Sequence, residues 1–218
     1  TLDRSSAASD VYKRQTLFGG DYRLHPTQSP AFTTSNQRPA APDSVPGNVK
    51  VAGANVLNFF NGDGNKGGFP TSRGASTFTE FVRQRIKLYE ELSRVNADVV
   101  TLMELENDGF GTTSAIAEMV KILNEGPCWN SLTECAALGY SSSGMGANTY
   151  ALVNIGSTIG TDEITVGIIY KPANVTLVGT PQTLTATGYT DPNNTGVQKS
   201  RPALAASFED NTWGERFT

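Results

Sequence analysis

Histidine and cysteine are scarce in this sequence, which has one histidine and two cysteines among 218 residues. Histidine-based acid–base chemistry would depend on His25, which lies in a proline-rich segment where we expect it to be exposed to solvent. The two cysteines, Cys128 and Cys135, have no further cysteine or histidine near them, which excludes a zinc site. A short-loop disulfide and a pair of free thiols both remain open for them.

Long apolar runs and an excess of positive charge are also missing. No stretch approaches the ~20 apolar residues of a membrane-spanning helix, and no secretory leader is visible, so a membrane is not an expected partner. The net charge of −4 argues against a passive electrostatic binder of nucleic acid. It is compatible with an enzyme that holds an anionic substrate through a metal ion and a few arginines. Nothing in the sequence indicates an obligate protein partner.

The composition divides the chain into three parts. Residues 1–15 resemble a translated sequencing adapter and are left out of the fold prediction. Residues 16–48 contain five prolines and little apolar periodicity, so we expect an extended linker there. Residues 49–218 carry regular apolar patterns and are expected to form the folded domain.

The folded part begins with a strand–helix–strand pattern. A strand is predicted for residues 50–60. A helix follows over 77–94, because Thr77 and Glu80 form a capping box and apolar residues then recur at helical spacing. The next strand is predicted at residues 98–103.

Further elements complete an α/β pattern. A second helix is predicted over residues 113–124 and stops at Gly126. Short strands are then predicted over four ranges, which are 150–154, 164–170, 175–178 and 203–208. Alternation of strands and helices followed by strands that look antiparallel predicts an α/β fold in which helices and sheets form layers.

An acid cluster follows the second strand. Residues 99–102 are apolar or β-branched throughout and predict a strand covered on both faces. Glu104, Glu106 and Asp108 then lie at its carboxyl end, where open α/β sheets place their ligands. The simpler interpretation is that these acids only solvate the strand end. Asn55 on the preceding strand favours a functional site instead, because parallel strands end at the same edge of a sheet.

Several segments in order resemble the endonuclease/exonuclease/phosphatase superfamily, in particular the secreted bacterial extracellular nucleases that are distant relatives of pancreatic-type deoxyribonuclease. The most specific segment is residues 97–109, and the others are 21–27, 55–64, 68–75, 80–87, 169–179 and 200–208. One departure is Ala54, because the residue before the asparagine is usually aromatic in this superfamily. The resemblance implies a deoxyribonuclease-like four-layer α/β/β/α sandwich, of which we expect the amino-terminal half here.

The resemblance also implies roles for three residues. Glu104 corresponds to a metal-binding glutamate, and Mg²⁺ is the expected ion, with Mn²⁺ or Ca²⁺ as alternatives. Asn55 corresponds to an asparagine that binds the scissile phosphate or metal-bound water. Arg201 corresponds to an arginine that grips a substrate phosphate. The implied activity is metal-dependent hydrolysis of DNA, and of RNA as a second substrate, in the extracellular space. Weaker candidates are Glu106, Asp108 and Tyr170.

The family's remaining catalytic motifs do not follow Arg201 in this chain. Hydrolysis needs a general base, usually a histidine held by an aspartate, and an Asp-x-Asn and an Asp-His pair that here do not follow Arg201. We therefore expect a chain truncated at its carboxyl end and inactive alone. Two alternatives stay open: a phosphatase or phospholipid phosphodiesterase of the same fold, and a non-catalytic α/β binding module.

Overall fold

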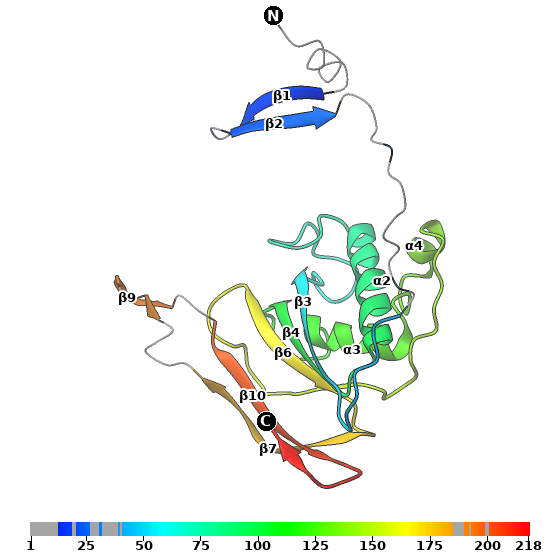
Figure 1. Ribbon diagram of the computed structural model, residues 1–218, viewed down its shortest axis with the longest axis vertical. Helices are drawn as coiled ribbons and strands as arrows, with labels where there is room; N and C mark the ends of the chain where they lie inside the picture. Colours follow the sequence, from blue (N-terminus) through cyan, green and yellow to red (C-terminus); the bar gives the residue numbers. More distant parts are fainter. Residues whose placement is uncertain are drawn as a thin grey trace, which may run out of the picture. The chain divides into compact units, whose positions relative to one another are not determined.

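A computed structural model describes residues 13–18, 21–26, 31, 39, 41–184, 190–191, 193–198 and 201–218 of the chain. The chain forms two compact units, Thr1–Ala40 and Ala41–Thr218 (Figure 1). The boundary between them lies eight residues before the 48/49 boundary that the composition predicts.

The first unit contains a β-hairpin where an extended linker was expected. Strands β1 (Lys13–Phe18) and β2 (Asp21–Pro26) pair antiparallel, and β2 includes His25. Strand β1 also includes residues 13–15, which resemble part of a translated sequencing adapter. The glycine pair at positions 19–20 of the sequence is a hairpin signal that an argument from proline content overlooks.

The second unit begins with the expected parallel strand–helix–strand unit. Strand β3 (Val51–Phe59) and strand β4 (Val99–Glu106) pair in parallel, and helix α2 (Phe78–Val95) connects them. Thr77 caps the helix as predicted, because its hydroxyl accepts the Glu80 amide hydrogen at 3.2 Å, and the Glu80 carboxylate accepts the backbone N–H of Ser76 at 2.9 Å.

Two further strands complete the first sheet, and two further helices follow β4 in the chain. Strand β6 (Ile164–Tyr170) pairs antiparallel with β4, and β5 (Ala151–Leu152) pairs with β6, so the sheet has the order β3-β4-β6-β5. Helix α3 (Ala115–Glu125) ends before Gly126, as expected. Helix α4 (Leu132–Ala137) was not predicted, since six residues give little periodicity.

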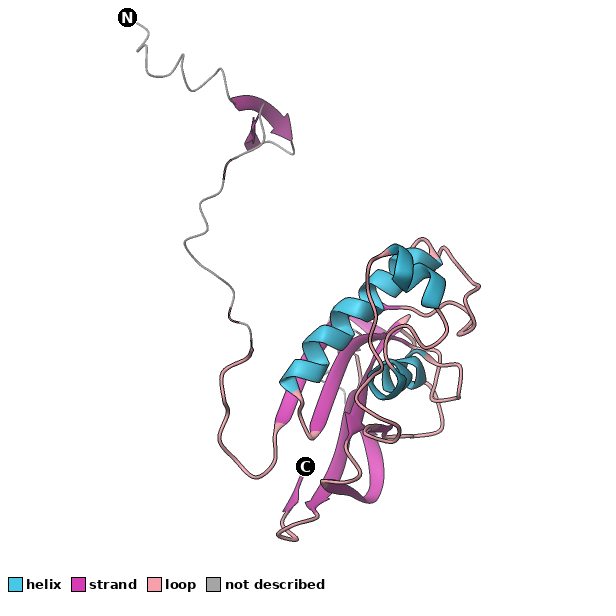
Figure 2. Cartoon of the chain, turned by 90° about the vertical axis from the view of Figure 1, so that its right-hand side faces the viewer, coloured by secondary structure: helices cyan, strands magenta, loops and turns pink. Residues whose placement is uncertain are grey.

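A second sheet packs against the first. Strands β7 (Val175–Leu184), β10 (Ala203–Asp210) and β11 (Arg216–Phe217) form a sheet of order β11-β10-β7. A cluster of buried residues joins the two sheets, and it comprises Val99, Val153, Ile168, Val175, Ala206 and Phe208. Helices, first sheet and second sheet thus follow one another as layers (Figures 1 and 2). This arrangement confirms the α/β class.

The remaining described strands form a small ribbon of their own. Strands β8 (Thr190–Asp191) and β9 (Asn194–Gln198) pair antiparallel with each other.

Tight contacts hold the helices on the first sheet. Val100, Leu102 and Leu105 of β4 belong to the same buried cluster as residues of α2 and α3. A Cβ at Gly167 of β6 would lie 2.6 Å from Cδ1 of Ile116 on α3, so a side chain at this position would displace the end of the Ile116 side chain.

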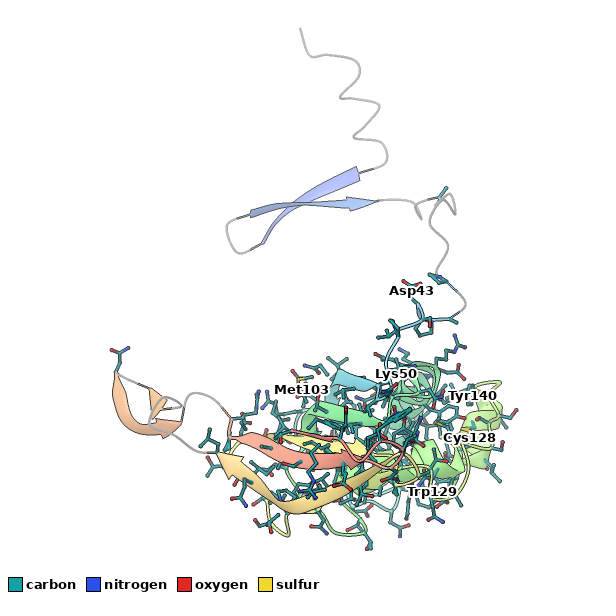
Figure 3. All side chains as sticks on the ribbon, turned by 60° about the horizontal axis from the view of Figure 1, so that its bottom comes forward. Asp43, Lys50, Met103, Cys128, Trp129 and Tyr140 are labelled. Carbon is teal, nitrogen blue, oxygen red and sulfur yellow. A yellow bond between two sulfur atoms is a disulfide. The ribbon has the colours of Figure 1, made fainter. Side chains whose placement is uncertain are left out.

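The face of β3 and β4 that does not contact the helices is only partly covered by the second sheet. Val99 is buried under that sheet, but Thr101 is exposed and Met103 is 39% exposed. The expectation that residues 99–102 are covered on both faces is therefore wrong at Thr101. Figure 3 labels Met103 on this face, away from Cys128 and Tyr140.

Cys128 and Cys135 form a disulfide, which decides between the two alternatives left open for them. Both cysteines are buried against Val82 of α2, and Tyr140 packs beside them. Among the described residues, no helix has the length and apolar character needed to cross a membrane.

Candidate functional site

Two adjoining bulges shape the carboxyl ends of β3 and β4. The pairing register shifts between Asn55 and Phe59 on β3, and between Met103 and Leu105 on β4. The bulged residues include three with left-handed backbone: Leu57 at φ 56°, Asn58 at φ 48° and Glu104 at φ 66°. This conformation costs leucine and glutamate about 1–2 kcal/mol each, whereas asparagine adopts it more readily. Backbone strain of this kind concentrates at functional sites.

The two bulges are joined by Asn58 and Glu104. The Asn58 backbone N–H donates a hydrogen bond of 3.2 Å to Oε2 of the Glu104 carboxylate. This bond spans 46 positions of sequence and fixes the carboxylate at the strand end. Oε1 of Glu104 accepts no hydrogen bond from the described residues.

Asn55 lies on the exposed face of β3 and supports the bulge that follows it. Its side-chain Oδ1 accepts the Leu57 backbone N–H at 2.9 Å. A local bond of this type stabilises a turn, so Asn55 has a structural role. Its Nδ2 donates to none of the described residues. The amide nitrogen therefore remains as the group that could donate to a phosphate or water oxygen.

The donor set suits a hydrated hard cation. Oδ1 of Asn58, the residue whose backbone N–H binds Glu104, is buried without a hydrogen-bond donor. Such an orphaned oxygen together with one free carboxylate oxygen matches Mg²⁺, which prefers oxygen ligands and keeps several waters. Within the described ranges, no three His, Cys, Asp or Glu side chains form a ready metal cage. The residues thus fit an ion held by Glu104, with water completing its coordination.

Glu106 anchors the loop that follows β3. Its Oε2 accepts the Asn61 backbone N–H at 3.0 Å, and the Asn61 side chain donates to the Thr113 carbonyl at 2.8 Å. Burial of the Glu106 carboxylate, helped by the negative charges of Asp108 and Glu163, raises its pKa to about 7, although the Asn61 hydrogen bond opposes the shift. Glu106 is therefore a positioning residue that titrates near neutral pH.

The other two residues of the acid-rich segment are also structural. Both carboxylate oxygens of Asp108 accept the Ala115 backbone N–H, at 3.1 and 3.0 Å, so Asp108 stabilises the start of α3. The Asn107 side chain donates to the carbonyls of Ile159 and Asp162, at 3.0 and 2.9 Å. Asn107 thereby fixes the loop before β6 to the end of β4.

Two arginines share one carboxylate on this loop. Nε of Arg201 and Nη1 of Arg73 lie 3.1 Å from the two different oxygens of Asp162. Glu163 is 4.0 Å from Nε of Arg73, beyond hydrogen-bond distance. Asp162 precedes Ile164 of β6 by two positions, and Ile164 pairs with Glu106 at the carboxyl end of β4. Because Arg201 binds Asp162, it lies just beyond this end of β4. Its terminal guanidinium nitrogens have no partner among the described residues.

The loop that carries Arg73 is packed on the bulge of β3. A Cβ at Gly74 would lie 2.8 Å from the Asn58 carbonyl oxygen and 2.8 Å from the Phe60 Cβ. Gly74 therefore approaches the residue that binds Glu104, and Arg73 is its neighbour. Glu104, Asn55, Arg201 and Arg73 thus gather at one end of the first sheet.

Tyr170 lies elsewhere. It pairs with Val99 at the opposite end of β4, and its ring packs 5.3 Å from the ring of Phe208 between the two sheets. The alternative that this tyrosine is a core residue is the one that the structure supports.

Four residues of this region were not singled out as site candidates from the sequence: Asn58, Asn107, Asp162 and Arg73. Asn58 and Asn107 lie within the segments that carry the family resemblance, and an amide next to a bulge or strand end is the available signal. Asp162 and Arg73 interact across 89 positions, which no local pattern reveals.

No family model and no curated protein matches the chain. The functional assignment therefore depends on the residues and contacts described above.

Proposed function

We propose that this chain forms the metal- and phosphate-binding part of a divalent-metal-dependent phosphodiester hydrolase that acts on DNA, with RNA as a second candidate substrate. The observation that carries the proposal is the hydrogen bond of 3.2 Å from the Asn58 amide to Glu104. It leaves one carboxylate oxygen free at the carboxyl end of a parallel strand pair, where α/β sheets bind their ligands.

Each proposed site residue has one task. Glu104 holds Mg²⁺, with Mn²⁺ or Ca²⁺ as other candidate ions, and the ion supplies charge neutralisation at the phosphate and at the leaving oxygen when bound. Asn55 donates its Nδ2 to a phosphate oxygen, since its Oδ1 is engaged by Leu57. Arg201 offers its terminal guanidinium nitrogens to a phosphate, because Asp162 already binds its Nε.

The proposal includes an extracellular location and a chain that is inactive alone. The Cys128–Cys135 bridge supports the location, because such bridges persist in oxidising compartments. Hydrolysis requires a base that takes a proton from the attacking water. The chain has one histidine, His25, and it lies outside the unit that contains Glu104. Cleavage of plasmid DNA by the purified chain in Mg²⁺ would contradict this part of the proposal.

Binding of a labelled DNA oligonucleotide in Mn²⁺ and in EDTA tests the proposed substrate and ion together. Mn²⁺ is expected to tighten binding to the unaltered chain by roughly 5–10-fold. Glu104→Gln should abolish this gain, and the exposed-site control Glu91→Gln should retain it. An equal gain in Glu104→Gln would overturn the metal assignment. Tighter Mn²⁺-dependent binding to phosphoinositide vesicles than to DNA would favour the phospholipid alternative.

A further inference from the structure

The two arginines on Asp162 have more hydrogen-bond donors than the neighbouring acids use. Two guanidinium groups lie 3.1 Å from one carboxylate, and Glu163 adds an ion pair with Arg73 at 4.0 Å, which is too long for a hydrogen bond. The two acids match the two cations in formal charge, but they leave most of the guanidinium N–H groups without an acceptor among the described residues. A pair that served only surface stability would gain little from this arrangement.

The cluster has unused hydrogen-bond donors. Each guanidinium carries five N–H groups in a planar fork, and Asp162 binds only Nε of Arg201 and Nη1 of Arg73. Both arginine side chains are about two-fifths exposed, at 42% and 39%. The remaining donors are therefore accessible to a ligand, and a phosphate with several acceptor oxygens suits two such forks.

The backbone around the cluster is fixed from two sides. Asn107 binds the loop of Asp162 through the Ile159 and Asp162 carbonyls, and Asp162 Oδ1 also accepts the Ile164 amide hydrogen at 3.3 Å. On the other side, Gly74 packs on the Asn58 carbonyl and positions the adjacent Arg73. The arginines are thus held before a ligand arrives, which reduces the ordering cost of binding.

The cluster lies along the same sheet end as Glu104. Glu104 precedes Glu106 by two residues on β4, and Asp162 precedes Ile164, the β6 residue that pairs with Glu106, by two residues. Because β4 and β6 are antiparallel, Glu104 and Asp162 lie on opposite sides of this pair along the strands. A phosphate bound at the arginines would therefore lie beyond Glu106, apart from one bound at Glu104.

We propose that Arg73 and Arg201, preset by Asp162, bind a backbone phosphate of the nucleic-acid strand that neighbours the phosphate at Glu104. This assignment rests on the proposed function, and it adds Arg73 as a substrate-binding residue and Asp162 as a positioning residue. It also gives the shared carboxylate a purpose, because Asp162 holds two cations in place that would otherwise separate.

Anisotropy titrations of a fluorescent single-stranded oligonucleotide with the full chain test the proposal, in EDTA and at several salt concentrations. Arg73→Ala and Arg201→Ala should each weaken binding by roughly 3–10-fold and reduce the salt slope by about 0.7. The control is Arg216→Ala, which removes an exposed arginine of β11 that pairs with Glu209. Arg216→Ala should change the affinity for the oligonucleotide by less than about 2-fold, because an exposed ion pair of this kind contributes little. Equal effects of Arg73→Ala and Arg216→Ala would overturn the proposal.

Asp162→Asn separates positioning from charge. This variant removes a negative charge, so a general electrostatic effect predicts tighter binding of the oligonucleotide. Presetting by Asp162 predicts weaker binding instead, because the two guanidiniums lose their shared anchor. Tighter binding in Asp162→Asn would contradict the presetting role. Circular dichroism of each variant confirms that the fold is kept.

Two further measurements identify the ligand and separate this proposal from the proposed metal site. Inorganic phosphate should compete only weakly with the oligonucleotide, whereas competition at equal phosphate concentration would assign the cluster to free phosphate. Because the titrations are made in EDTA, Glu104→Gln should bind the oligonucleotide at least as tightly as the unaltered chain. If Arg73→Ala and Arg201→Ala leave oligonucleotide binding unchanged while Glu104 still binds Mn²⁺, only the arginine proposal is refuted. If both arginine variants weaken binding but Glu104→Gln leaves Mn²⁺ binding unchanged, only the metal site is refuted.

Discussion

The backbone N–H of Asn58 donates a hydrogen bond of 3.2 Å to the carboxylate of Glu104, and both residues have left-handed backbone. Each lies in a bulge, and the bulges adjoin at the carboxyl ends of two parallel strands. The bond fixes a carboxylate oxygen and leaves the other free.

The first prediction concerns backbone strain at Leu57. Its side chain is 73% exposed and its φ is 56°, a conformation that glycine adopts without a steric cost. Leu57→Gly should therefore stabilise the chain, or leave it unchanged, within about 1 kcal/mol. Urea unfolding measures this free energy. In the control Leu132→Gly, at an exposed position of α4, stability should fall by about 1 kcal/mol. Equal losses in both variants would show that Leu57 is not strained.

The second prediction concerns the packing of Gly74 on Asn58. A methyl group at position 74 would meet backbone at 2.8 Å, so Gly74→Ala should displace the loop and reduce stability by about 1–3 kcal/mol. It should also weaken the contribution of Arg73 to oligonucleotide binding. The matched control is Gly111→Ala, since no atom lies within 4 Å of a Cβ built there. If both variants unfold at the same urea concentration, the close approach is wrong.

The third prediction is a pH dependence of stability from Glu106. Its pKa is about 7 in the folded chain, above the ordinary value of 4.5, so the folded state retains a proton that the unfolded state has lost. Stability should therefore fall as the pH rises from 5 to 8, by roughly 1–3 kcal/mol from this group. Urea unfolding at several pH values in EDTA measures it.

The variant Glu106→Gln isolates this effect. It should remove most of the fall and be more stable than the unaltered chain at pH 8, where the unaltered carboxylate is charged and partly buried. Glu91→Gln, at an exposed site of α2, should keep the fall. A Glu106→Gln profile that parallels the unaltered chain from pH 5 to 8 would assign the pH dependence to other groups.

The fourth prediction concerns the disulfide. Cys128 and Cys135 are separated by seven positions, and closing such a loop stabilises a fold by about 2–3 kcal/mol. Reduction should lower the urea midpoint, and the double variant Cys128→Ser, Cys135→Ser should be equally destabilised and insensitive to reductant. Both cysteines are almost fully buried, so reduction of the native chain should be slow. An unchanged midpoint after complete reduction would exclude a structural contribution.

Local sequence patterns predicted the first strand–helix–strand unit of the folded domain. The capping box at Thr77 and the helical spacing that follows it gave α2, and the apolar run at residues 99–102 gave most of β4. The same patterns could not predict the bulges, because neither leucine nor glutamate is a residue type that signals left-handed backbone. The exposure of the Thr101 side chain was also not predicted, because it depends on how far the second sheet extends over β4.

The candidate site was only partly accessible from sequence for a similar reason. Asn55 and Glu104 follow strand patterns, and the structure places them on adjoining bulges. Arg201 could be named, but its pairing with Asp162 could not, because 39 positions separate them. The role of Arg73 emerges only from the loop contact at Gly74. Contacts of this kind depend on tertiary packing and leave no local signature.

The most direct test of the central claim is a Mn²⁺ titration of the full chain, followed by electron paramagnetic resonance of the free ion. The account predicts one saturable site in the unaltered chain and in Glu91→Gln. In Glu104→Gln, affinity for this site should fall by roughly 10–100-fold, because the amide keeps the hydrogen bond from Asn58 but loses the anionic ligand. Mn²⁺ binding of equal affinity in Glu104→Gln and the unaltered chain would contradict the account.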